Sequence, residues 1–310
     1  MTKSLQNIAN LLEYFGFESR SYYHSVSAVN YDPNDLLAYY LDMSPRADYL
    51  GPFDPNGLPL MVLGEKLVIF PTHLIMYGLG HLEKYRQERQ DECLARFRLC
   101  AEWLVDNQSD DGSWLVTVPN KPFKIAPPFR SAMVQGLAIS MLVRASALLA
   151  DDRFVNSATL GLQPFHHLTN DNGVTTKHEQ GVFYEEYPCQ PPRHVLNGFL
   201  YAMWGLHDLV RLDGNTEAQE LWQSGLETLI KWLPDFDLGY WSLYQLPVRP
   251  CNPATVPYHR LHINQLDVMA AITSQPIFGE YRDRWQDYLG HRLNGVRTLP
   301  AKLRWLTGNK

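Results

Sequence analysis

The segment Ser131-Ala-Met-Val-Gln-Gly-Leu-Ala-Ile-Ser140 would be apolar on nearly every side of a helix. A helix with this pattern is covered by protein all round. It belongs to the run from Arg130 to Leu149, in which apolar residues recur every three or four positions. The same spacing returns on both sides of this run, in pairs of segments. The sequence therefore predicts a fold built of helix pairs.

Four helical hairpins are predicted from this spacing. Their helices are expected at 71–86 and 91–105, 130–149 and 152–168, 193–212 and 216–233, and 258–272 and 276–288. The first helices of the pairs follow one another at a coarse period of roughly 60 residues. They are also richer in small and apolar residues, which suggests an inner and an outer ring of helices. The predicted fold class is mainly α, an α/α toroid or incomplete barrel of about four hairpins.

The first 70 residues break the helical pattern. Met1–Gly16 has apolar residues along one side and is expected to form a short amphipathic helix. Four prolines and three glycines between positions 45 and 64 prevent long helices, and 58–70 is expected to form one or two short strands. Because so small a core is marginal alone, we expect 1–70 to pack on the toroid as a helix, loop and β-hairpin segment. Residues 71–310 then form the α/α-barrel domain.

Composition narrows the function. The 310 residues are 45% hydrophobic and 19% charged, which is typical of a globular protein, and the net charge is -6. This charge disfavours generic nucleic-acid binding, so an anionic ligand needs a local basic site. We expect no signal peptide and no membrane span, because no long uninterrupted apolar run occurs. Four cysteines without CxxC spacing favour a cytoplasmic protein that uses no metal.

Two polar clusters are candidates for chemistry. Phe183-Tyr-Glu-Glu-Tyr-Pro188 holds two carboxylates and two phenols in four positions. In an extended chain Glu185 and Tyr187 would point one way and Tyr184 and Glu186 the other, unless the chain turns. A tyrosine-rich surface strand is the competing interpretation of this cluster.

The second cluster is Tyr258-His259-Arg260-Leu261-His262-Ile263-Asn264-Gln265, at the start of the fourth inner helix. His259 and His262 share a helix face. No third ligand follows at a metal-motif spacing, so a ligand-binding stripe is a better interpretation than zinc. Buried polar groups that hold helix ends are the alternative. Gly239-Tyr-Trp-Ser-Leu-Tyr244 adds aromatic residues of the kind that stack on sugars or fill a core. The sequence has no GxGxxG, P-loop or GxSxG motif, which disfavours nucleotide and serine-hydrolase functions.

Four segments in order resemble the signature segments of the D-glucuronyl C5-epimerases of heparan sulfate and heparin biosynthesis. They are 131–140, Phe183–Pro188, Val195-Leu-Asn-Gly-Phe199 and 258–266. The resemblance covers roughly residues 60 to 295, while the large amino-terminal β portion of animal members is mostly missing. It implies an α/α barrel that converts D-glucuronate to L-iduronate within a heparosan-type polysaccharide, without a cofactor, and often as a homodimer.

The resemblance also implies roles for four residues. Glu186 and Tyr187 match the family's catalytic Glu-Tyr pair, Tyr258 its second essential tyrosine and Tyr244 a third. The reaction needs two acid/base groups on opposite faces of the sugar, and donors or cations that stabilise an enolate-like state. Glu186 suits the base if burial raises its pKa toward neutrality, and Tyr258 suits the opposing acid.

One departure from the family concerns positive charge. Family members commonly carry Tyr-Asp-Leu-Arg where this chain has Tyr244-Gln-Leu-Pro247, so an arginine is absent, and Arg249 is our candidate substitute. Substrate binding is assigned to Arg130, Lys177, Arg193, His194, Asn197, Arg249, His259, Arg260, His262 and Asn264. Of these, Arg130, Lys177, Arg193 and His194 are expected to form a local anion-binding track with Lys121, Lys124 and His178.

Other functions stay open at this stage. A uronate polysaccharide lyase begins with the same proton abstraction at C5 and then eliminates the group at C4. A noncatalytic glycan-binding homologue is a third hypothesis, although it has no need of both Glu186 and Tyr258. A glycoside hydrolase fits poorly, because the adjacent Glu185 and Glu186 are unsuited to flank a bond from opposite sides.

Overall fold

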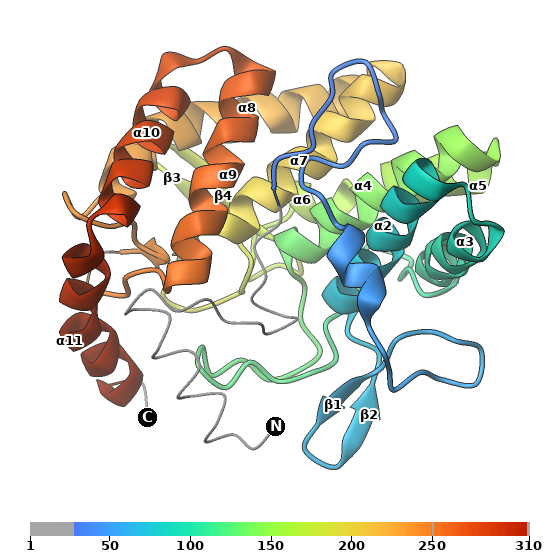
Figure 1. Cartoon of the computed structure of the whole chain (residues 1–310), viewed down its shortest axis with the longest axis horizontal. Coiled ribbons are helices and arrows are strands. Elements are labelled where there is room, and N and C mark those ends of the chain that lie inside the picture. Colours follow the sequence, from blue (N-terminus) through green and yellow to red (C-terminus); the bar gives the residue numbers. More distant parts are fainter. Residues whose placement is uncertain (1–27, 248, 250, 309–310) are drawn as a thin grey trace. The chain divides into compact units, whose positions relative to one another are not determined.

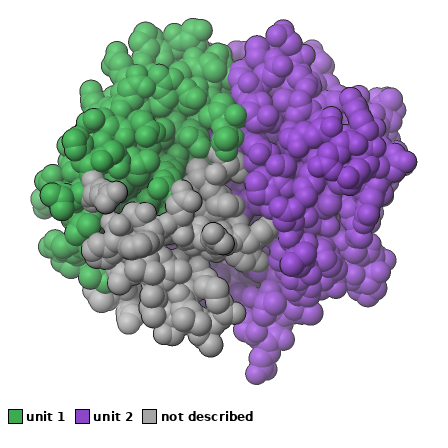
Figure 2. Space-filling model, viewed as in Figure 1, with its two compact units in different colours: residues 1–29, 195–197, 232–310 green, residues 30–194, 198–231 purple. Residues whose placement is uncertain are grey.

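The structure is a computed structural model that describes residues 28–247, 249 and 251–308. These residues form two compact units, coloured separately in Figure 2. Unit 2 comprises 30–194 and 198–231, and unit 1 comprises 195–197 with the described residues of 232–310 and 28–29. Both units are mainly helical, which confirms the predicted class. The predicted division at residue 70 and the helix expected at Met1–Gly16, which lies outside the described residues, stay predictions.

Unit 2 holds three of the predicted helix pairs (Figure 1). Its helices are η2 (Ser44–Asp48), α2 (Pro71–Glu88), α3 (Asp91–Asp106), α4 (Ala132–Leu149), α5 (Asp152–Leu160), α6 (Gln163–His166), and nearly all of α7 (Leu196–Asp213) and α8 (Thr216–Trp232). Within the pairs α2 packs on α3 and α4 on α5. The rings of His207 on α7 and Trp222 on α8 lie 4.9 Å apart. The predicted pairing is thus present within this unit.

Helix α4 is the core helix that its sequence predicted. Every residue from Ala132 to Ala145 is buried. A Cβ on Gly136 would lie 2.9 Å from the Ala202 nitrogen of α7, so only glycine allows the two backbones to approach this closely. By length and composition α4 could cross a membrane. Its burial inside unit 2 is that of a core helix in a globular protein.

Two segments of unit 2 differ from the simple hairpin pattern. The predicted helix 152–168 ends at Leu160, and α6 follows as a separate short helix with Pro164 in its first turn. Proline has no N–H and so does not continue a helix. After α6 come β3 (Thr175–His178) and β4 (Gly181–Tyr184), an antiparallel hairpin. The chain bends after Tyr184. The predicted alternation of side chains applied only to an extended chain, so it does not hold beyond this bend.

A second antiparallel hairpin lies near the start of unit 2. It consists of β1 (Met61–Leu63) and β2 (Lys66–Val68), which confirms the short strands expected within 58–70. The chain before it packs through η2 on α2. Residues 30–70 therefore belong to the same compact unit as α2.

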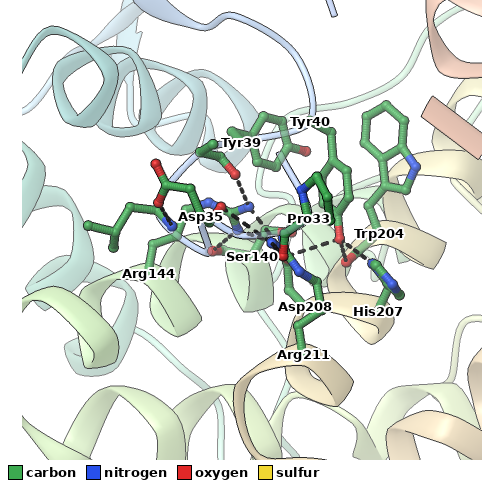
Figure 3. Close-up of polar contacts among 12 residues, drawn as sticks. Pro33, Asp35, Tyr39, Tyr40, Ser140, Arg144, Trp204, His207, Asp208 and Arg211 are labelled. Carbon is green, nitrogen blue, oxygen red and sulfur yellow. Dashed lines mark hydrogen bonds and ion pairs between the residues drawn. The ribbon is translucent and has the colours of Figure 1, made fainter. Parts of the chain in front are cut away.

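A buried polar cluster ties the chain around Tyr40 to two helices of unit 2 (Figure 3). Arg144 of α4 pairs with Asp208 of α7 at 2.6 Å, and both side chains are fully buried. Arg144 also donates to the Ala38 carbonyl at 2.8 Å. The Tyr40 hydroxyl donates to Asp208 at 3.0 Å and lies 2.7 Å from His207 Nδ1. A buried arginine needs such partners, so this cluster fixes the segment in place.

Unit 1 holds the fourth predicted pair. Its elements are η3 (Leu233–Phe236), β6 (Gln245–Leu246), α9 (Val256–Thr273), α10 (Pro276–Gly290) and α11 (Arg292–Gly308), and β5 (His194–Val195) ends in it. Helix α9 packs on α10, and α10 contacts α11. The Leu196 amide donates to the Tyr244 carbonyl at 3.2 Å, which joins 195–197 to this unit. Helix α11 was not predicted from the apolar spacing, and Pro300 lies inside it.

Candidate active site

Glu186 is a buried carboxyl at the bend that follows β4 in unit 2. Its side chain is 6% exposed, and its Oε2 atom has no hydrogen-bond partner among the described residues. Burial raises the pKa of Glu186 to about 7, and a hydrogen bond with Tyr187 acts in the opposite direction. The condition that the sequence analysis set for a base is thereby met. Such a group takes up and releases a proton near neutral pH.

A glycine makes room for this carboxyl. A Cβ on Gly198 of α7 would lie 2.6 Å from the Glu186 Cβ and closer still to Oε2. Real carbon atoms do not approach so closely, so any larger residue here moves Glu186. Tyr187 is half-buried next to it, and its ring stacks on Phe123 with centroids 4.5 Å apart. Glu186 and Tyr187, the two residues of unit 2 that match the family's catalytic pair, are therefore packed against Gly198 and Phe123 respectively.

The neighbouring Glu185 has a different environment. Its Oε1 accepts a hydrogen bond from the Thr176 hydroxyl at 2.6 Å and lies 2.6 Å from His194 Nδ1. Its backbone carbonyl accepts from the Ala132 amide at the start of α4. His194 is itself buried against Phe183, with ring centroids 4.8 Å apart. Glu185 and His194 thus hold the bend that presents Glu186.

Tyr244 and Tyr258 meet within unit 1. Their rings are edge-to-face, with centroids 4.9 Å apart. Tyr244 lies just before β6, and its amide donates to the Asn252 carbonyl at 2.9 Å. Tyr258 stands in the first turn of α9, directly after Pro257, which suits a helix start. The structure therefore brings together the two tyrosines of this unit that the family match assigned.

His259 and His262 lie in the core of unit 1. Ser242 Oγ is 2.8 Å from His259 Nδ1 and 3.0 Å from His262 Nδ1, and His259 Nε2 is 3.0 Å from the Trp285 carbonyl. The His259 ring also stacks on Trp241 at 3.7 Å. Burial lowers the pKa of His259 to about 3 and that of His262 well below its usual range. This is the environment of neutral groups that hold a helix end.

The basic residues assigned to substrate binding differ in their exposure and in their polar partners. Arg130 forms an ion pair with Asp111 and donates to Asn172, so its charge already has partners in unit 2. Lys177 on β3 is exposed, as is Arg249. Among the other residues assigned to substrate binding, Arg193, Arg260 and Asn264 are half-buried and Asn197 is buried. The remaining members of the anion-binding track, Lys121, Lys124 and His178, are exposed.

Residues 28–247, 249 and 251–308 contain no group of three or more His, Cys, Asp or Glu placed to hold a metal ion. Asp111 forms an ion pair with Arg130, and Asp237 forms one with Arg284.

Sequence reasoning missed Lys302. This lysine on α11 directs its ammonium at the Tyr244 ring, with 5.7 Å from Nζ to the centroid. It stands 58 positions from Tyr244 in a helix that the periodicity did not predict. The only signal in the sequence was indirect, namely the arginine missing from Tyr244-Gln-Leu-Pro247.

A family model described as the D-glucuronyl C5-epimerase C-terminus matches residues 108–287. A D-glucuronyl C5-epimerase of Caenorhabditis elegans is 35% identical over 228 residues, which is 66% of this chain and 36% of that protein. An uncharacterized protein of Methanocaldococcus jannaschii is 27% identical over 169 residues, 53% of this chain and 54% of that protein. The chain thus spans about a third and about half of the lengths of these relatives.

Proposed function

The chain belongs to the family of D-glucuronyl C5-epimerase C-terminal domains, and on that premise we propose that it inverts C5 of D-glucuronate residues in a heparosan-type polysaccharide. The observation that carries the proposal is Glu186, a buried carboxyl whose pKa is raised to about 7. The C5 hydrogen is only weakly acidic because it lies α to a carboxylate. Removing it calls for a base that is ionised near neutral pH.

The proposed reaction has two proton transfers. Glu186 takes the C5 proton, and the electrons of the C–H bond form an enolate with the neighbouring carboxylate. Tyr258 then donates its phenolic proton to the opposite face of C5, which gives L-iduronate and a tyrosinate. Glu186 then releases its proton to solvent and the Tyr258 phenolate takes one up, which returns both groups to their starting states. Tyr187, which hydrogen-bonds Glu186, and Tyr244, which contacts the Tyr258 ring, support one proton-transfer group each.

The same proposal includes the finer expectations from the sequence. The substrate is an anionic polysaccharide met by local basic residues, and the protein is a cytoplasmic homodimer that needs no cofactor. The helix pairs are proposed to complete an α/α toroid. A lyase remains the second candidate, because it shares the first proton transfer.

The test is C5 exchange in deuterated water. Heparosan incubated with the protein should gain deuterium at C5 and acquire iduronate, both detectable by NMR, without the new absorbance of unsaturated chain ends. Glu186→Gln and Tyr258→Phe should each lower the exchange rate by about 10²- to 10⁴-fold. Glu227→Gln and Tyr288→Phe, the same changes at residues outside the proposed site, should exchange like the wild type. Unsaturated ends would favour the lyase, and full exchange in both site variants would remove the assignment.

A further inference from the structure

Lys302 is held by neutral acceptors in unit 1. Its ammonium donates to Asn252 Oδ1 at 2.6 Å and to the Pro253 carbonyl at 3.1 Å. Both acceptors belong to the loop that leads from β6 into α9. An ammonium has three N–H donors, so one donor remains beyond these two bonds.

Aromatic rings form the rest of its surroundings. Nζ lies 5.7 Å from the centroid of the Tyr244 ring and 5.2 Å from that of Trp305. The Tyr244 ring in turn meets Tyr258 edge-to-face at 4.9 Å. The ammonium therefore sits beside the tyrosine pair to which a proton-transfer role is assigned above.

The positive charge of Lys302 has no carboxylate partner among the described residues. Burial lowers its pKa to about 8, and the Cys251 thiol is the group that raises it. Burial raises the pKa of the Cys251 thiol, and the positive charges of Arg304 and Lys302 lower it. The titratable groups around the ammonium are thus the Tyr244 phenol and the Cys251 thiol. Keeping a cation half-buried without a counter-ion costs stability, and such positions are common in sites that bind anions.

Arg249, the cation nearest to Tyr244 in the sequence after that tyrosine, is exposed. Lys302 reaches the same tyrosine from a different element, α11.

We propose that Lys302 binds the carboxylate of the uronate residue beside Tyr244. The inference rests on the proposed function, since a uronate is the ligand in question. Two N–H groups hold the ammonium on the loop, and the third is offered to the carboxylate. As C5 loses its proton the carboxylate gains negative charge, so the same contact strengthens in the enolate.

The first experiment measures kcat/KM for C5 exchange from about pH 6 to about pH 9. Lys302→Met should lower kcat/KM by about 10- to 100-fold, the usual effect of losing a hydrogen bond to a charged group. Lys302→Arg keeps the charge and should keep most of the activity. The wild type should lose activity above pH 8 as the ammonium deprotonates. The arginine variant should lack this alkaline decline, because a guanidinium stays charged.

A matched control is Lys231→Met, which removes an exposed lysine that also donates to a backbone carbonyl, that of Gln180. It should leave both kcat/KM and its pH profile unchanged. A lysine that merely ties α11 to the loop would leave the alkaline decline in Lys302→Arg. That outcome, or wild-type kcat/KM in a folded Lys302→Met, would overturn the proposal.

A binding experiment separates this inference from the proposed function. The pKa of Lys302 is followed by NMR of ¹³Cε-labelled lysine, with Lys302→Met identifying its signal. A heparosan oligosaccharide should raise that pKa by about one unit, and its carboxyl-reduced analogue should not. An enzyme without C5 exchange whose Lys302 still responds would refute the proposed function alone. A Lys302 pKa that the oligosaccharide leaves unchanged would refute the carboxylate site.

Discussion

Replacing Glu186 by glutamine should make the protein more stable than the wild type at alkaline pH while lowering the rate of C5 exchange. The wild-type carboxyl has a pKa of about 7 in the folded protein against an ordinary value of 4.5, because burial penalises its charged form. Above pH 4.5 the Glu186 carboxyl of the unfolded chain loses its proton without penalty. In the folded protein the same carboxyl is buried, so its ionisation costs free energy. Stability that is present below pH 4.5 is therefore lost as the pH rises to 7.

The size of the effect follows from the shift. One pKa unit corresponds to about 1.36 kcal/mol, so the full shift is worth about 3 kcal/mol, most of which falls between pH 5 and pH 8. Glutamine has nearly the same shape and stays neutral throughout. The free energy of unfolding of Glu186→Gln, minus that of the wild type, should thus rise by about 2 to 3 kcal/mol between these two pH values.

The assay is urea unfolding followed by tryptophan fluorescence, at both pH values and one ionic strength. Taking the difference of differences removes the contributions of every other titrating group. Glu185→Gln is the matched control on the adjacent residue. Its carboxylate accepts from Thr176 and pairs with His194, so this variant should be less stable than the wild type by about 1–3 kcal/mol. A rise below about 0.5 kcal/mol for Glu186→Gln would refute the reasoning.

Four further outcomes are expected. Gly198→Ala should displace the site carboxyl and lower kcat for exchange by at least about 10-fold, with an unchanged circular dichroism spectrum. In the wild type, kcat/KM should fall about tenfold per pH unit on the acid side of a pKa of about 7, because the base must be ionised; a pH-independent acid range would contradict this. Arg144→Met should cost about 3–5 kcal/mol in chemical unfolding because it leaves Asp208 buried without its partner, whereas Arg144→Met combined with Asp208→Leu should cost less. Neutralising Arg130 and Arg193 together should weaken heparosan binding and flatten its salt dependence in titrations; unchanged affinity would remove them from the anion-binding track.

The helix pairs were predictable because their signal is local. An apolar residue every three or four positions specifies one buried face, and the bounds of α2, α3 and α10 differ from the prediction by two residues or fewer. The break between α5 and α6 was less visible, because the apolar pattern continues through Pro164. The family motif likewise identified Glu186, since its neighbours along the chain are part of the motif.

Burial and partners were not predictable from spacing alone. Glu185 and Glu186 are adjacent and chemically identical, yet Thr176 and His194 hold Oε1 of Glu185, whereas burial raises the pKa of Glu186 to about 7. The histidines of α9 share the predicted face, but that face packs into the core. Contacts with residues far along the chain make these differences.

The sequence by itself therefore determined the helical class and the family, because apolar spacing and short motifs are local features of the chain. The tertiary structure decided which carboxyl has a pKa near neutrality and which cation stands beside Tyr244. Both depend on the loss of water around a side chain, and residues distant in sequence bring about that loss. Gly198 leaves the space for Glu186, and α11 carries Lys302 to a tyrosine 58 positions earlier.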